Sequence, residues 1–132
     1  MNSDYQRVRF RAEPPETGLP AVFAVVTACN PNGKSVTQEH NAIATKTLRD
    51  ALKQARLVFF PVTGGAPDFS HAEPGFGIVL SNVEEAVEWG RRFRQEAVFW
   101  VVRGRVHLVC CAAGDGGGLD IGAWEELANR PA

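Results

Sequence analysis

The chain has 132 residues, of which 45% are hydrophobic, so it can build one domain with its own core but not two. Its 14 Lys and Arg residues nearly balance its 15 Asp and Glu residues, which gives a formal net charge of −1. A molecule with this balance lacks the overall positive field that drives non-specific binding to nucleic acids or anionic membranes. We therefore expect a single domain over residues 1–132, and the charge argues against a nucleic-acid partner.

The apolar runs of the chain predict a protein without a membrane span. "AVFAVVTAC" and "AVFWVV" are strand-sized and fall short of the ~20 residues that cross a bilayer as a helix. The first residues, "MNSDYQRVRFRAEPPE", lack the apolar centre of a secretory signal, so we expect a cytoplasmic protein. The spacing of Cys29, Cys110 and Cys111 matches neither a disulfide framework nor a zinc site, and we interpret all three as small buried hydrophobic residues.

Residues 1–20 predict an N-terminal strand and a proline-rich connection. Val8 and Phe10 alternate with Arg7, Arg9 and Arg11, which is the period of a half-buried strand with one basic face. The adjacent prolines of "AEPPETGLP" then end this strand. In "AVFAVVTAC" both alternate sets are apolar, which predicts a central strand covered on both faces.

The apolar periodicity predicts two main helices. The first begins at a capping box of Ser35 and Gln38 and runs to Arg56. The second begins at a capping box of Ser81 and Glu84 and ends in arginines that complement the helix dipole. Between them we expect the strands "LVFFPV", interrupted by its proline, and "FGIVL", joined by the turn-rich loop "TGGAPDFSHAEPG".

The last third of the chain, "AVFWVVRGRVHLVCC" and beyond, predicts a β-hairpin that turns at Arg103 and Gly104. The composition of residues 113–120 predicts a flexible glycine-rich loop, and a short amphipathic helix capped by Asp120 ends the chain. Strands therefore come in pairs between helices. This order favours an α+β fold with an antiparallel or mixed sheet, two main helices packed on it and a short C-terminal helix.

The stretch "TACNPNGKSV" resembles a Walker A loop, because Gly33, Lys34 and Ser35 follow a buried strand and precede a helix. A phosphate cradle presents consecutive backbone N–H groups, and Pro31 removes one of them. Ala28 also replaces the first glycine. We therefore interpret "NPNG" as a turn, with Pro31 at its second position and Gly33 free to take a positive φ.

Four polar residues are candidate ligand-binding residues: Thr27, Asn30, Asn41 and Gln95. Thr27 and Asn30 stand at the end of the central strand, where Asn30 either contacts a ligand or bonds to the turn. Asn41 falls near the apolar stripe of the first helix, and Gln95 lies between the second helix and an apolar strand. Buried amides need hydrogen-bond partners, so each of them either ties down a loop or contacts a ligand.

The segment "PDFSHAEPG" contains the candidate catalytic residues His71 and Glu73. If "HAE" is extended, both side chains project to the same side, so the carboxylate could orient the imidazole for general-base catalysis. Asp68 could join them around a metal, but the spacing matches no metal motif, and catalytic zinc needs three protein ligands. We therefore predict no metal site, and a structural network of loop hydrogen bonds remains the alternative to a catalytic role.

The ordered set "FAVVTACNPNGKS", "EHN", "GGAPDFSHAEPGFGIVL" and "EEAVEWGRRFRQEAVFWVV" resembles the small bacterial domain of unknown function 3293, from about Phe23 to about Val109. The resemblance implies that the residues of the family's shared pattern correspond in this chain to Thr27, Asn30, Pro31, Glu39, Asn41, His71, Glu73, Pro74 and Gln95. Arg94 stands where glycine is common in the family. The family carries no established activity, so the resemblance implies neither a reaction nor a cofactor.

Two functions are compatible with these residues. In the first, a pocket binds a small polar or anionic ligand, with His71 as proton carrier and Glu73 as its orienting carboxylate. In the second, a non-catalytic module binds protein or nucleic acid through its arginine-bearing strand face, and the polar residues are structural. An open concavity lined by the polar residues would favour the pocket, and full burial would favour the structural network. The sequence identifies no cofactor and no oligomeric state.

Overall fold

The computed structural model describes residues 3–112 and 118–128. Its strands are β1 (Arg9–Ala12), β2 (Val22–Thr27), β3 (Phe59–Gly65), β4 (Ala72–Ile78), β5 (Ala97–Val102), β6 (Arg105–Cys110) and β7 (Leu119–Ala123). Its α-helices are α1 (Gln38–Gln54), α2 (Val83–Arg92) and α3 (Trp124–Leu127), and short 3-10 helices span Ser3–Arg7 and Pro31–Gly33.

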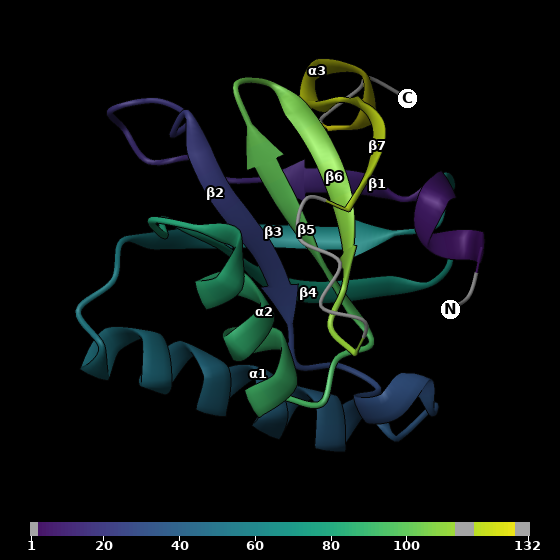
Figure 1. Cartoon of the computed structure of the whole chain (residues 1–132). Helices are drawn as coiled ribbons and strands as arrows, with labels where there is room; N and C mark the ends of the chain where they lie inside the picture. The colour runs from purple at the N-terminus through teal and green to yellow at the C-terminus, as the bar shows by residue number, and fades with distance from the viewer. Residues whose placement is uncertain (1–2, 113–117, 129–132) are drawn as a thin grey trace.

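The described strands form one seven-stranded sheet in the order β1-β3-β4-β2-β5-β6-β7, and each neighbouring pair is antiparallel (Figure 1). The strand predicted to be central, β2, lies in the middle between β4 and β5. β5 and β6 form the predicted hairpin, in which Arg103 and Gly104 both have positive φ. The predicted α+β fold, with two main helices and a short C-terminal helix, is confirmed.

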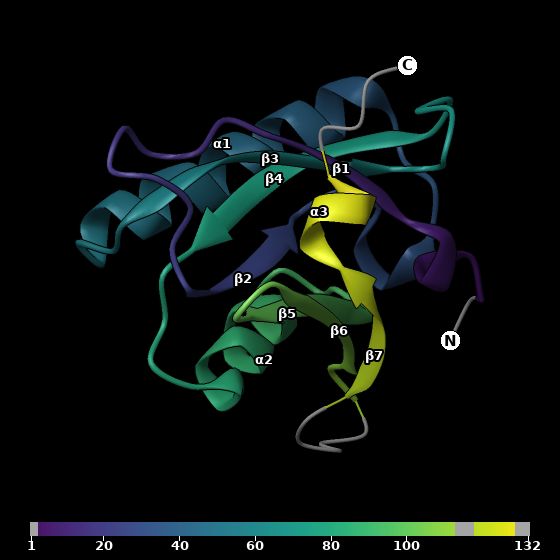
Figure 2. The ribbon, with the colours of Figure 1, turned by 90° about the horizontal axis from the view of Figure 1, so that it is seen from above.

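The two faces of the sheet bury separate cores. On one face, α1 and α2 contribute Leu48, Leu52 and Ala86, which pack against sheet residues such as Val26. The other face curls around α3, which lies between β1 and β7 (Figure 2). An isolated bridge from Phe10 to Ala128 joins β1 to the end of α3 and so brings the two ends of the curled sheet together.

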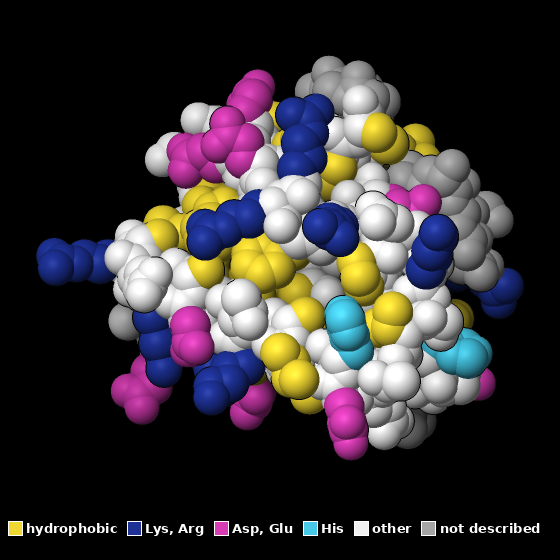
Figure 3. Space-filling model, turned by 90° about the horizontal axis from the view of Figure 1, so that it is seen from below, with side chains coloured by type: hydrophobic (Ala, Val, Ile, Leu, Met, Phe, Trp, Pro, Cys, Tyr) yellow, Lys and Arg dark blue, Asp and Glu magenta, His cyan; other side chains and the backbone are white. Residues whose placement is uncertain are grey.

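The surface seen from below in Figure 3 carries charges of both signs. Lys and Arg side chains are interspersed there with Asp and Glu side chains around a hydrophobic area. This mixture agrees with the near-zero net charge of the chain. Within the described ranges, no helix is both long and apolar enough to cross a membrane.

Both main helices begin later than the sequence predicted. Thr37, rather than Ser35, caps α1, and its hydroxyl accepts a backbone hydrogen bond at 3.1 Å. Asn82, rather than Ser81, caps α2, and its side-chain oxygen accepts a backbone hydrogen bond at 3.0 Å. The two predicted capping boxes were wrong because each helix is preceded by several residues of capping type, and the turn before the helix decides among them.

Both main helices end in a Schellman motif with an arginine in the left-handed conformation. At the end of α2, Arg94 has a φ of 58°, Arg94 N donates to Arg91 O at 3.0 Å, and Gln95 N donates to Gly90 O at 2.8 Å. The chain leaves α1 in the same way at Arg56, which also has a φ of 58°. The helix therefore ends at Gln54, whereas the sequence predicted an end at Arg56. The left-handed position of this motif favours glycine, which explains the glycine expected at position 94.

The stretch predicted to be a loop, residues 63–75, is mostly a β-hairpin, because it includes the end of β3 and the start of β4. Only residues 66–71 form the turn. Pro61 does not interrupt β3: it stays in register with β4, and its carbonyl accepts from Glu13 N at 2.9 Å. Two glycines in this stretch allow close packing: a Cβ on Gly75 would lie 2.5 Å from Val26 O, and one on Gly65 would lie 3.0 Å from His71 O.

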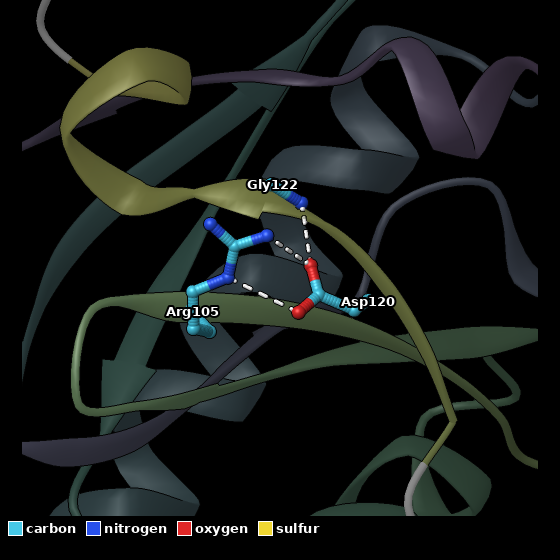
Figure 4. Close-up of polar contacts among 3 residues, drawn as sticks. All are labelled: Arg105, Asp120 and Gly122. Carbon is cyan, nitrogen blue, oxygen red and sulfur yellow. Dashed lines mark hydrogen bonds and ion pairs between the residues drawn. The ribbon is translucent and has the colours of Figure 1, made fainter.

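The predicted cap of the last helix was also wrong. Asp120 belongs to β7, a strand that the sequence did not predict, and it forms an ion pair with Arg105 of β6 at 2.7 Å (Figure 4). Asp120 also accepts from Gly122 N at 3.0 Å, and the residue before α3 is Ala123. Of the loop predicted over residues 113–120, residues 113–117 lie outside the described residues, and the last two belong to β7.

Candidate functional site

The antiparallel topology gathers the ends of five strands at one end of the sheet. β2 and β3 end where β1, β4 and β5 begin, so the residues just beyond these strand ends lie together. A cleft of about 790 Å³ lies there. Val8, Val25 and Cys29 in its lining are buried, whereas Ser35 and His71 are exposed. Small-molecule sites commonly have a volume in this range.

Asn30 is held at the edge of this cleft by Asn41 from the first turn of α1. Asn41 Oδ1 accepts from Asn30 N at 2.8 Å, and Asn41 Nδ2 donates to Asn30 Oδ1 at 3.1 Å. Asn30 has a φ of 49°, in the left-handed region that asparagine adopts more readily than most residues. Of the two amides, Asn30 lines the cleft, so Asn41 acts as the residue that positions it.

Glu73 of β4 connects the polar residues into one network. Thr27 Oγ1 lies 3.3 Å from Glu73 Oε1, and Asn30 Nδ2 donates to Glu73 Oε2 at 3.0 Å. Thr27 Oγ1 also lies 3.1 Å from Gln95 Oε1. The structure therefore brings together all four predicted ligand-binding residues and one of the two predicted catalytic residues.

Two backbone carbonyls fix the side chain of Gln95. Its Nε2 donates to Cys29 O and to Phe93 O, both at 3.1 Å. A flipped amide would place its oxygen against these two carbonyl oxygens, so the amide oxygen must point toward Thr27. The Schellman motif fixes the backbone at the same place, and Gln95 is thereby held at both ends.

His71 lines the same cleft as Asn30 but does not contact Glu73 in the way the sequence suggested. It is exposed in the turn before β4, and among the described residues its ring nitrogens have no hydrogen-bond partner. Asp68 lies in the same turn, where hydrogen bonds from Ser70 hold its pKa below the usual value and the charge of His71 lowers it further. The carboxylate of Glu73 instead accepts from residues of β2 and the loop that follows it.

Tyr5 and Glu96 also line the cleft, and sequence reasoning missed both. Tyr5 OH donates to Glu96 Oε1 at 3.0 Å, and burial, followed by this hydrogen bond, raises the pKa of Tyr5. The side chain of Glu96 also packs closely against Gly33, since a Cβ added to Gly33 would lie 2.5 Å from Glu96 Oε1. The only sequence signal for Glu96 was a charged residue directly before an apolar strand, and Tyr5 lies in a segment without a recognisable pattern.

The Walker-like stretch is a turn, as predicted. It forms the 3-10 helix Pro31–Gly33, and Gly33 has a φ of 72°. Asn32 N donates to Arg94 O at 2.7 Å, and the next two amides donate within the turn at 3.0 and 3.2 Å. These N–H groups already have acceptors, so the stretch does not present the free row that a phosphate cradle requires.

The cysteines do not add reactive groups to the cleft. Cys29 and Cys111 are buried as predicted, while Cys110 is half-buried, and all three are free thiols. Burial raises the pKa of Cys29, and burial together with the neighbouring Cys110 raises the pKa of Cys111 to about 11. In the part of the chain that the structure describes, no three His, Cys, Asp or Glu side chains are grouped to hold a metal ion.

The fold and the cleft define a single-domain α+β protein in which a polar network lines one end of an antiparallel sheet. A family model described as "Protein of unknown function (DUF3293)" matches residues 26–98, which is more than half of the chain. The chain belongs to this family. The matched segment contains every site residue predicted from the sequence, whereas Tyr5 lies outside it. Neither the curated proteins nor the solved structures contain a match to the chain.

Proposed function

We propose that the cleft binds a small polar ligand through Thr27, Asn30, Glu73 and Gln95. The observation that carries this proposal is the combination of an open cleft with a polar network whose side chains are already fixed by the fold. Binding sites of small molecules are typically concave, with a few polar groups held in place by other contacts. Both features occur at the same end of the sheet.

The position of these residues favours the pocket over a purely structural network. Thr27, Asn30, Glu73 and Gln95 are half-buried, and all four line the cleft. A network that served only to hold the loops together would be more stable if it were closed to solvent, because solvent competes for its hydrogen bonds. Their partial exposure supports contact with a ligand.

His71 is the residue we propose for any proton transfer to the bound ligand. Histidine is the side chain that proteins use most often for this purpose, and His71 has free ring nitrogens within the described residues. In this proposal, Glu73 contacts the ligand directly and does not orient the imidazole.

The proposal is tested by a thermal-shift screen of nucleotides, metal salts and common metabolites against three proteins: the wild type, His71→Ala and His40→Ala. His40 is an exposed histidine on α1 that does not line the cleft, so its replacement is a matched control. A ligand at ~100 times its dissociation constant adds about 2.7 kcal/mol of stability, which raises Tm on the order of 10 °C in a domain of this size.

We expect at least one compound to raise Tm in the wild type and in His40→Ala, with a smaller rise in His71→Ala. Equal Tm shifts in all three proteins would show that His71 does not take part in binding. If no compound stabilises the wild type, the pocket is overturned, and the alternative of a protein-interaction module is favoured.

A further inference from the structure

We propose that the ligand of this cleft is an organic cation with N–H donors, such as an ammonium or guanidinium group on a small apolar body. This inference rests on the proposed function and names the class of ligand. It follows from the balance of hydrogen-bond donors and acceptors in the lining and from two carboxylates that form no ion pair with any described residue.

The lining around Thr27 contains more acceptors than donors. The Thr27 hydroxyl has one hydrogen, yet it lies 3.3 Å from Glu73 Oε1 and 3.1 Å from Gln95 Oε1. Both of these oxygens can only accept when Glu73 is ionised, and the two carbonyls bonded to Gln95 Nε2 prevent the amide from turning its nitrogen toward Thr27. At any moment one of the two oxygens therefore lacks a donor among the described protein groups, and a ligand N–H group would supply it.

The charges of Glu73 and Glu96 point to a cation. Both side chains are half-buried and line the cleft, and within the described residues neither forms an ion pair. Glu73 accepts only from Thr27 and Asn30, and Glu96 accepts from Tyr5. Removing a carboxylate from water without a cationic partner is unfavourable, so a bound cation would offset part of that penalty.

The remaining lining favours an organic cation over an anion or a metal ion. Val8, Val25 and Phe99 form an apolar part of the cleft that would contact hydrocarbon, and no group of three ligating side chains is available among the described residues. The basic residues of the lining, Arg7 and His71, are exposed. Among the charged residues of the lining, the carboxylates of Glu73 and Glu96 are therefore the more buried groups.

Four probes of similar shape test the inference: n-butylammonium, n-butylguanidinium, n-butanol and n-butyrate. Each is titrated into ¹⁵N-labelled protein, and binding is followed by NMR on the side-chain amide signals of Asn30 and Gln95. We expect at least one of the two cations to bind about tenfold or more tightly than butanol, the gain expected from hydrogen bonds to a charged group. Butyrate should be the weakest of the four probes.

Two variants locate the interaction. Glu73→Gln and Glu96→Gln remove one charge each with little change of shape, and Glu88→Gln removes the same charge from an exposed position on α2, outside the cleft. We expect at least one of the cleft variants to weaken binding of the cations about tenfold and to change butanol binding much less, and Glu88→Gln to behave as the wild type.

The inference is overturned if butanol or butyrate binds as tightly as the cations, or if both cleft variants keep the wild-type affinity for the cations. In either case the proposed function stands as long as the thermal-shift screen identifies a compound that stabilises the wild type. Failure of the proposed function is recognised separately. In that case no compound of the screen raises the Tm of the wild type, and none of the four probes changes the NMR signals of Asn30 and Gln95.

Discussion

Asn30 illustrates how much of the site depends on single residues. Its backbone N–H and its side chain are bonded to Asn41, its Oδ1 also accepts from Val36 N at 3.2 Å, and its Nδ2 donates to Glu73. The sequence predicted that Asn30 would lie at the end of the central strand and Asn41 near the apolar stripe of the first helix. It could not predict which amide faces the cleft, because that depends on the left-handed turn at Asn30.

Replacing Arg94 by glycine should stabilise the protein. A non-glycine residue in the left-handed region is disfavoured by about 1–2 kcal/mol, and the greater freedom of glycine in the unfolded chain cancels part of the gain. We expect Arg94→Gly to raise the free energy of unfolding by about 0.5–1 kcal/mol in urea denaturation. Glu88→Gly, within α2, should lower it by about 1 kcal/mol. Destabilisation by Arg94→Gly would contradict the Schellman motif at the end of α2.

The buried thiol of Cys111 should make stability depend on pH in the alkaline range. Its pKa rises from an ordinary 9.0 to about 11 in the folded protein, so folding favours the protonated thiol. The stability that this thiol contributes is complete below pH 9 and is lost as the pH rises toward 11. Urea denaturation at pH 8, 9, 10 and 11 should show a steeper loss of stability in the wild type than in Cys111→Ala. Parallel curves for the two proteins would exclude this source of pH dependence.

At the scale of elements, the helices and most strands could be predicted because their apolar residues recur with a regular period. The predictions failed where backbone geometry decides the structure. Residues 63–75 are rich in glycine and proline, which usually mark loops, but here Gly65 and Gly75 allow neighbouring backbone to approach closely. Strand β7 has only five residues, and its alternation of Leu119, Ile121 and Ala123 was missed because Asp120 was interpreted as the cap of the last helix. The strand is held by pairing with β6 and by the ion pair of Asp120, neither of which the local sequence indicates.

The start of α1 can be tested by two alanine substitutions. Thr37→Ala removes the hydroxyl that caps the helix and should lower the free energy of unfolding by about 1 kcal/mol. Ser35→Ala changes an exposed residue before the cap, and we expect an effect within about 0.5 kcal/mol. Thermal or urea denaturation of the two variants, measured side by side, shows which of the two residues caps α1. A larger loss from Ser35→Ala would restore the cap predicted from the sequence.

At the scale of the whole molecule, the cleft is a product of the strand order. The polar candidates come from β2, the loop after it, α1, β4 and the segment after α2, and the sequence alone could place each of them on its own element. Their meeting requires the antiparallel pairings of β2 with both β4 and β5. Such long-range pairings depend on the global arrangement, so the sequence predicted the residues of the site better than their contacts.

The curl of the sheet should depend on Trp124. Its ring stacks on Phe10 at a centroid distance of 5.1 Å and meets the edge of Phe23 at 5.2 Å, and only 6% of the residue is exposed. We expect Trp124→Ala to lower the free energy of unfolding by about 3–5 kcal/mol. Trp89→Ala on α2 is the control. Because Trp89 is half-buried, its replacement should lower the free energy of unfolding by about 1 kcal/mol. Equal losses in urea denaturation would show that α3 does not anchor the second core.

The most direct test of the proposed function is a crystal structure of the protein with the compound that gives the largest thermal stabilisation. We predict that the compound occupies the cleft and contacts side chains among Thr27, Asn30, Glu73 and Gln95, whose positions should change little on binding because the fold already fixes them. A compound bound at another surface, such as the face that carries Arg9 and Arg11, with the cleft empty, would contradict the account.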